Sequence, residues 1–336
     1  MVDADPGMMT AMPLWLMKAT ALIVGACFGS FANVVIHRVP RGLSIVRPGS
    51  ACPGCGHMIR WYENIPILSW VFLRGRCSSC HMPISVRYPM VELMVAIMSL
   101  ASLFLALSTG DGLQASPGEI AALWFFPFSL TFLLVCIIFI DLEHWIIPHV
   151  LTIIGIVLGI GRSLLLGDVV GVAWHESLIG AAAGALPIVL IIEVYFRLTG
   201  REGMGYGDVM LMAMAGAWFG YIALPFILLA ASLQGLIGAI PMLASRNRPV
   251  PPWQNQNPPT DQAADKPAET DMAETAETAD RDETKSVDET AETSTRPPAA
   301  AAPVRQMAIP FGPFIALAVF EWLFFQDLIL THIMRF

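Results

Sequence analysis

Residues 121–140 read AALWFFPFSLTFLLVCIIFI, a run of twenty residues without a charged side chain. A helix needs about 20 apolar residues to cross the hydrocarbon core of a bilayer, so this run predicts a membrane span. Further runs that approach or reach this length lie near residues 15–37, 88–107, 145–166, 177–196, 208–222, 223–244 and 309–330. The sequence therefore predicts an all-α polytopic membrane protein with about eight transmembrane helices.

The composition of the 336 residues supports this class. Hydrophobic residues make up 55% and charged residues only 14%, with a mean hydropathy of +0.63. An ordinary soluble domain, with about 25% charged residues, is excluded. The net charge of -8 comes entirely from residues 250–304, which hold 12 acidic and 4 basic side chains. This distribution also excludes a nucleic-acid-binding protein of the basic-surface kind.

The loop after the first predicted helix is strongly basic. It carries Arg38, Arg41, Arg47, Arg60, Arg74, Arg76 and Arg87. Because Glu63 is its only acid, the positive-inside rule places this loop in the cytoplasm and the N-terminus outside. Arg162, near the outer end of the fourth predicted helix, then lies on the side where the rule does not expect a basic residue. The N-terminal tip carries Asp3 and Asp5 rather than the basic start of a signal peptide.

The chain divides into five predicted segments. They are the tip with the first helix (1–39), a cytoplasmic loop with four cysteines (40–87), a membrane core of six helices (88–245), an acidic insertion (246–306) and the last helix (307–336). The insertion repeats Ala-Glu-Thr and Asp-Glu-Thr units and has almost no large apolar side chain. It is predicted to be disordered and dispensable, and an acidic tail that binds a partner is the alternative.

Four of the six cysteines form two Cys-x-x-Cys pairs in the basic loop. Cys52 and Cys55 lie in CPGCG, and Cys77 and Cys80 lie in CSSCH, with 21 residues between the pairs. Turns of this kind let four thiolates converge on one ion, which predicts a closed, structural Zn²⁺ site. Two disulfides are the alternative, but thiols are kept reduced in the cytoplasm. The histidines that follow the pairs, His57 and His81, are expected to be bystanders.

Ionisable residues at membrane depth are costly and are candidates for function. Asp141 ends a predicted helix in IFIDLEHW, and Asp208 begins another in GMGYGDVML. Two carboxylates brought close cannot both ionise easily, so one holds a proton while the other activates water, as in aspartic peptidases. The simpler interpretations are a helix N-cap or first-turn residue for Asp208 and an interfacial charge for Asp141. The glycines Gly203, Gly205 and Gly207 favour function at Asp208, since they allow an extended substrate to approach closely.

Three other carboxylates near the membrane are expected to be structural. Glu92 could pair with a neighbouring arginine, and Glu193 lies close enough to a helix end to reach water. Glu321 falls in the middle of a predicted span and is expected to have a buried partner.

An ordered set of short motifs runs along almost the whole chain outside the insertion. They are GSF (29–31), NVVIHR (33–38), WYENIP (61–66), LSW (68–70), RGRC (74–77), RYP (87–89), GMGYGD (203–208) and IPFGP (309–313). With the two cysteine pairs and the two aspartates, the chain resembles the type IV prepilin peptidases. These are membrane aspartic peptidases that mature pilins and the pseudopilins of type II secretion.

The resemblance implies that Asp141 and Asp208 form a catalytic dyad at the cytoplasmic face of the bacterial inner membrane, where it cuts after a glycine of the leader. It also implies N-methylation of the new N-terminus with S-adenosylmethionine, because the four-cysteine loop is typical of the bifunctional members. Glu63 and Arg87 are our suggestion for the methyl-donor site. The implied partners are prepilins, pseudopilins and the lipid bilayer.

Two positions depart from the family pattern. Met210 stands where Lys is frequent, and His149 stands where Asp or Asn is frequent. Both departures are expected to change the pH profile or substrate preference without abolishing activity. The alternatives to a prepilin peptidase are a GxGD intramembrane protease that cuts within a transmembrane segment, an ion transporter that uses the carboxylates, and a non-catalytic assembly factor.

Overall fold

The computed structural model describes residues 13–109, 116–200, 205–244 and 310–334. Over these residues the chain is helical, apart from turns and two isolated β-bridges. Several predictions lie outside the described residues. They concern the N-terminal tip, the acidic insertion (246–306), Gly203 and Ile309.

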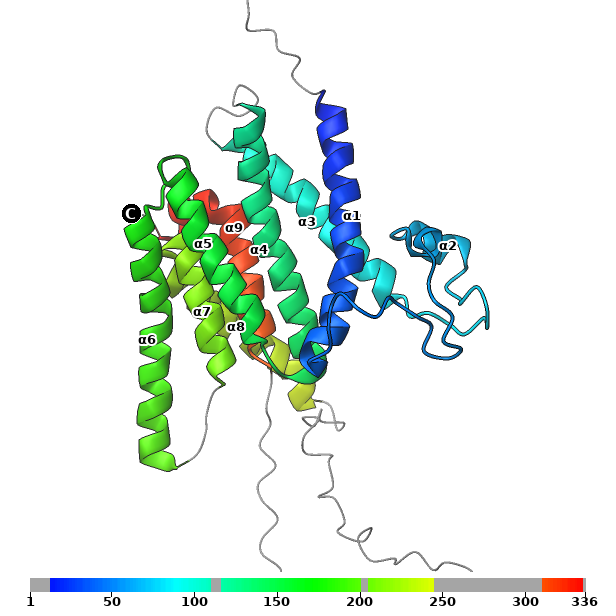
Figure 1. Ribbon diagram of the computed structural model, residues 1–336. Coiled ribbons are helices and arrows are strands. Elements are labelled where there is room, and N and C mark those ends of the chain that lie inside the picture. Colours follow the sequence, from blue (N-terminus) through cyan, green and yellow to red (C-terminus); the bar gives the residue numbers. More distant parts are fainter. Residues whose placement is uncertain (1–12, 110–115, 201–204, 245–309, 335–336) are drawn as a thin grey trace, which may run out of the picture. The chain divides into compact units, whose positions relative to one another are not determined.

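Seven of the described helices are long and apolar enough to cross a membrane. They are α1 (Leu14–Arg38), α3 (Arg87–Ser108), α4 (Pro117–His144), α5 (His149–Val170), α6 (Trp174–Thr199), α8 (Ala223–Ala244) and α9 (Gly312–Ile329), as Figure 1 shows. A short π-helical turn, η5 (Leu330–Met334), extends α9. The predicted all-α membrane fold is confirmed.

The remaining predicted span corresponds to α7 (Tyr206–Phe219). Its 14 residues reach about 21 Å, which is shorter than the hydrocarbon core of about 30 Å. Every residue from Leu211 to Gly220 is buried, because α7 packs against α5, α6, α8 and α9. The indole of Trp218 is fully buried and donates a hydrogen bond to the carbonyl of Gly155 at 2.7 Å. The apolar residues on all sides of α7 therefore face protein rather than lipid.

Glycines set how closely α6 and α7 pack. A Cβ atom added at Gly180 would lie 2.2 Å from the carbonyl oxygen of Gly216, and one at Gly184 would lie 2.3 Å from that of Met212. A glycine also sets how closely α1 packs on α3, since a Cβ at Gly29 would lie 2.5 Å from the Cα of Glu92. Small residues at such crossings let two membrane helices approach until their backbones touch.

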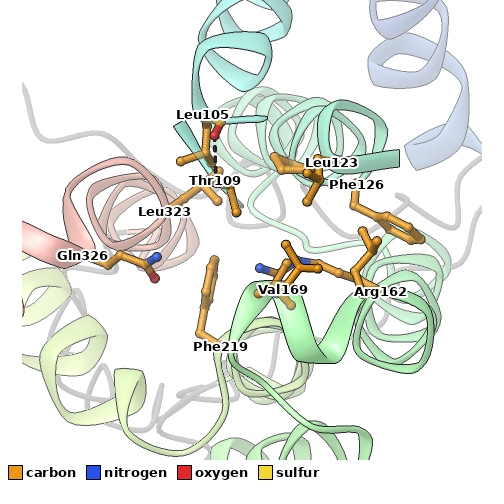
Figure 2. Close-up of a pocket in the computed structure, with 12 residues that line it drawn as sticks. Leu105, Thr109, Leu123, Phe126, Arg162, Val169, Phe219, Leu323 and Gln326 are labelled. Carbon is orange, nitrogen blue, oxygen red and sulfur yellow. Dashed lines mark hydrogen bonds between the residues drawn. The ribbon is translucent and has the colours of Figure 1, made fainter. Parts of the chain in front are cut away.

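Arg162 of α5 stabilises the end of α7. Its Nη1 donates to the carbonyl oxygen of Trp218 at 2.8 Å, and its guanidinium lies 5.7 Å from the centre of the Trp218 ring. The last carbonyls of a helix have no partner within the helix, so this bond satisfies one of them. Figure 2 shows that the guanidinium also borders a cavity of about 90 Å³ lined by side chains from α3, α4, α5, α7 and α9. This contact gives the buried Arg162 side chain a partner within the helices.

We expect Gly184→Ala to destabilise the packing of α6 on α7 by about 1–3 kcal/mol, because its Cβ overlaps backbone that cannot yield easily. Thermal unfolding of the detergent-solubilised protein measures the effect. Gly161→Ala is the matched control, since a Cβ at this helical glycine of α5 meets no atom within 4 Å. Equal melting temperatures for the two variants would contradict the close crossing.

Candidate active site and metal centre

Asp141 lies in the last turn of α4 and is 5% exposed. The helix ends at Trp145, whose φ of 59° turns the chain away before Pro148 leads into α5. The backbone N–H of Gly312, the first residue of α9, donates to the Asp141 carboxylate. A Cβ atom at Gly312 would lie only 2.5 Å from Oδ2 of Asp141. The N-terminus of α9 therefore contacts the Asp141 carboxylate directly.

Asp208 lies in the first turn of α7 and is partly buried. The N-cap of this helix is Gly205, and no side chain caps it. The backbone N–H of Asp208 bonds to the carbonyl of Gly205 at 3.2 Å. Asp208 is thus not the N-cap residue, but it occupies the first turn, which is the other position that the simpler interpretation allows.

Ile147 connects the surroundings of the two aspartates. A Cβ at Gly207 would lie 2.8 Å from the Cβ of Ile147, and one at Gly312 would lie 2.8 Å from its Cδ1. The starts of α7 and α9 therefore meet at the loop that follows Asp141. At this junction, burial and the negative charge of Asp141 together raise the pKa of Asp208 to about 7. The structure thus brings the two aspartates within electrostatic reach of each other.

Gly312 and Ile147 were missed as site residues in the sequence. The IPFGP motif at 309–313 marked this stretch as part of the family pattern, but it did not indicate which residue Gly312 would contact. The close contact with Asp141 depends on α9 packing against α4, and these helices are more than 160 residues apart in the sequence.

The four paired cysteines converge in the structure. Their sulfur atoms all lie within 4.8 Å of one another. The Sγ atoms of Cys52 and Cys80 are 3.8 Å apart, and those of Cys55 and Cys77 are 4.0 Å apart. Thiolates bound at about 2.3 Å to a tetrahedral ion are about 3.8 Å apart, whereas a disulfide bond measures about 2.05 Å. The four thiols therefore fit a tetrahedral metal ion and do not fit disulfides.

The two cysteine pairs lie in matching turns. In the first turn, the N–H of Cys52 bonds to the carbonyl of His57 at 2.9 Å, and in the second the N–H of Cys77 bonds to that of Met82 at 2.9 Å. Backbone N–H groups of Ser79 and Cys80 also point at the sulfur of Cys77, which favours its thiolate form. Both turns thus present sulfur atoms to a common centre.

The two histidines beside the cysteines lie outside this sulfur cluster. His57 Nε2 lies 3.1 Å from a carboxylate oxygen of Glu63. His81 has a φ of 59° and matches Gly56, with a φ of 71°, in the first turn. His81 therefore supplies the left-handed backbone conformation that this turn requires.

The suggested methyl-donor residues have separate partners. Hydrogen bonds from the Arg60 N–H and the Ser78 side chain lower the pKa of Glu63 to about 2, so this carboxylate is ionised. Arg87 forms an ion pair with Glu143 and lies over the ring of Phe139. Within the described part of the chain, no hydrogen bond or ion pair joins Glu63 to Arg87.

The three other carboxylates have identifiable structural partners. Glu92 accepts the N–H of Ile67 at 2.7 Å, rather than pairing with an arginine. Glu193 pairs with Arg197 one turn later at 2.6 Å. Glu321 of α9 accepts a hydrogen bond from Gln234 of α8 at 2.9 Å, which is the partner expected for a mid-span carboxylate.

The fold and site define a multi-pass helical membrane protein with a four-cysteine cluster that could hold a metal ion. Residues 23–106 match the bacterial peptidase A24 N-terminal domain, and residues 128–240 match the type IV leader peptidase family. The chain belongs to the type IV leader peptidase family. No solved structure matches it.

Similar proteins named prepilin leader peptidase/N-methyltransferase occur in several bacteria. The chain is 38% identical to the protein of Myxococcus xanthus over 90% of this chain and 88% of that protein. It is 38% identical to the Aeromonas hydrophila protein over 70% of this chain and 86% of that protein. For the Pseudomonas aeruginosa protein the identity is 36%, over 70% and 83%.

We expect the purified protein to carry about one tightly bound metal ion, zinc, per chain. Cys77→Ser should lose it, because three thiolates leave the tetrahedron open. His57→Ala and His81→Ala are the controls and should keep it. Elemental analysis after dialysis measures the metal content. Full metal content in Cys77→Ser, or loss of metal in both histidine variants, would contradict this set of ligands.

Proposed function

We propose that this protein cleaves the leader peptide of type IV prepilins and pseudopilins and then methylates the new N-terminus. The observation that carries the proposal is the close approach of Gly207 and Gly312 to Ile147, which brings the starts of α7 and α9, and with them Asp208, to the loop that follows Asp141. Membership of the leader peptidase family and the names of the similar proteins support the choice of substrate.

In the proposed reaction, the ionised member of the dyad takes a proton from water as the water oxygen attacks the scissile carbonyl carbon. The protonated member donates its proton to the carbonyl oxygen, which gives a tetrahedral diol. As the C–N bond breaks, the proton taken from water passes from the first aspartate to the leaving amine, and the second aspartate regains its proton from a hydroxyl of the diol. The raised pKa of Asp208 supports a shared proton near neutral pH. The N–H of Gly312 orients the Asp141 carboxylate throughout. No covalent enzyme intermediate is formed.

We place the dyad at the cytoplasmic face of the bacterial inner membrane, with the N-terminus outside. The arginines of residues 38–87 support this orientation. Asp141 lies in the last turn of α4 together with Glu143, the partner of Arg87 at the start of α3. The dyad would then lie at the depth where the apolar helix of a pilin meets the cytoplasm.

We propose S-adenosylmethionine as the methyl donor and keep Arg87 and Glu63 as candidates for its contacts. Arg87 is tied to Glu143, which lies two residues after Asp141. A methyl donor bound beside Arg87 would lie close to the amine that peptide cleavage releases. Zinc bound by the four cysteines would stabilise the loop that carries Glu63.

Asp141→Asn and Asp208→Asn are each expected to lower prepilin cleavage by about 10²- to 10⁴-fold, because an amide cannot exchange the proton. Cleavage by the full-length enzyme in liposomes, without an imposed ion gradient, measures the rate. The unfolding temperature of each variant controls for folding. Near wild-type cleavage by either folded variant would refute the dyad.

Gly312→Ala is expected to reduce cleavage by about tenfold or more, since its methyl group overlaps the Asp141 carboxylate and displaces it from productive geometry. Gly235→Ala is the matched control, because a Cβ at this glycine of α8 makes only ordinary contacts of 3.6 Å. The ratio of the two rates, measured on the same prepilin, isolates the effect at Asp141. Equal rates would show that α9 does not position the carboxylate.

Prepilin cleavage is expected to decline as the pH rises through about 7, because Asp208 then loses the proton that the reaction requires. A pH–rate profile of kcat/KM measures this, with the unfolding temperature followed over the same range. Met210→Lys places a cation two residues after Asp208 and should move the decline to lower pH. An unchanged profile would remove Met210 as a determinant of the dyad's protonation.

A further inference from the structure

Residues 61–72 expose an unusual amount of apolar surface for a cytoplasmic loop. This segment contains the 3₁₀ turn η2 (Trp61–Asn64) and the short helix α2 (Leu68–Phe72), which contact each other. Its exposed apolar side chains are Trp61, Tyr62, Ile65, Leu68, Val71 and Phe72. Trp61 is 82% exposed and Phe72 is 81% exposed. Clustered exposed apolar side chains of this kind mark an interaction surface.

Two hydrogen bonds hold the segment beside membrane helices. Ser30 of α1 donates to Asn64 at 3.4 Å, and the N–H of Ile67 donates to Glu92 of α3 at 2.7 Å. Ser30 precedes Arg38 by eight residues, which is about 12 Å along α1. Glu92 follows Arg87 by five residues, or about 8 Å along α3. The segment therefore lies alongside the last turns of α1 and the first turns of α3, inward of the charges at those helix ends.

The polar groups of the segment suit a membrane interface. Its one acidic side chain, Glu63, is held within the loop by the N–H of Arg60 and by His57. Arg60 lies 5.9 Å from the ring centre of Tyr62 and donates to its hydroxyl at 2.6 Å. Exposed Arg74 and Arg76 follow the segment. Trp and Tyr concentrate at the level of lipid headgroups, and arginines there attract anionic lipids.

We propose that residues 61–72 are seated in the cytoplasmic leaflet of the bilayer. Their apolar side chains contact acyl chains, while Arg60, Arg74 and Arg76 contact anionic headgroups. The segment links the four-cysteine cluster to α3 through the bond from Ile67 to Glu92. Seating it in the leaflet fixes the metal-binding loop at the membrane surface. This role is additional to catalysis and does not depend on the proposed substrate.

The test uses the full chain in liposomes that contain a phospholipid with a diazirine in its acyl chain. After irradiation, mass spectrometry locates the lipid adducts. We expect adducts in residues 61–72 at a yield close to that of Leu190, a 63% exposed residue of the spanning helix α6. Val46 is the matched control: it is 76% exposed in the same loop but outside the segment, and should be labelled about tenfold less.

Two variants of Glu92 distinguish loss of the hydrogen bond between Ile67 and Glu92 from a general loss of folding. Glu92→Ala removes the acceptor for the Ile67 N–H, so adducts in 61–72 should fall about threefold or more while those at Leu190 stay. Glu92→Gln keeps an acceptor oxygen and should retain them.

Three outcomes would overturn the proposal. One is the absence of adducts in 61–72 when Leu190 is labelled, and another is equal labelling of Val46 and the segment. The third is loss of the adducts when a saturating prepilin is added, which would assign the surface to the substrate. None of these readouts uses peptide cleavage, so the result is independent of the peptidase assignment.

Discussion

The enclosure of α7 by its neighbours is the constraint on which the site depends. Asp208 begins a helix too short to span the bilayer, so its position is set by packing against protein and not by lipid. That packing requires the glycine contacts with α6 and the fully buried Trp218 between α5 and α7. At the C-terminal end of α7, Arg162 donates a hydrogen bond to the carbonyl oxygen of Trp218. With α7 held in this way, its first turn reaches the loop after Asp141.

The N-terminus of α9 completes this site. Gly312 brings a backbone N–H to Asp141, and its lack of a side chain makes room for the carboxylate. A helix N-terminus favours a negative charge nearby. Asp208 is at the start of α7, where burial and the charge of Asp141 raise its pKa. In the proposed dyad, the two carboxylates would share one proton between these helix ends.

The cysteine loop is attached to the membrane helices through specific polar contacts. Glu92 is buried in α3, and its carboxylate accepts the N–H of Ile67, a residue with a φ of 62°. Glu63 of the same segment bonds to the His57 ring and to the N–H of Arg60, and the carbonyl of His57 accepts the N–H of Cys52. A buried carboxylate of α3 and the sulfur cluster are thus connected through residues 57–67. This connection gives the exposed aromatic side chains of the segment a fixed place beside α1 and α3.

The sequence by itself determined the membrane class, the limits of most helices, the four-cysteine motif and the family. These features are local: apolar runs of spanning length, tight Cys-x-x-Cys turns and short motifs can be identified without knowing what packs against them. Tertiary structure alone decided that α7 lies within the helices, that Glu92 accepts a backbone N–H and that Gly312 touches Asp141. Each of these contacts joins residues far apart in the chain, and side-chain type does not specify such a partner. Periodicity also could not separate a short enclosed helix from a spanning one, because both bury apolar residues on every side.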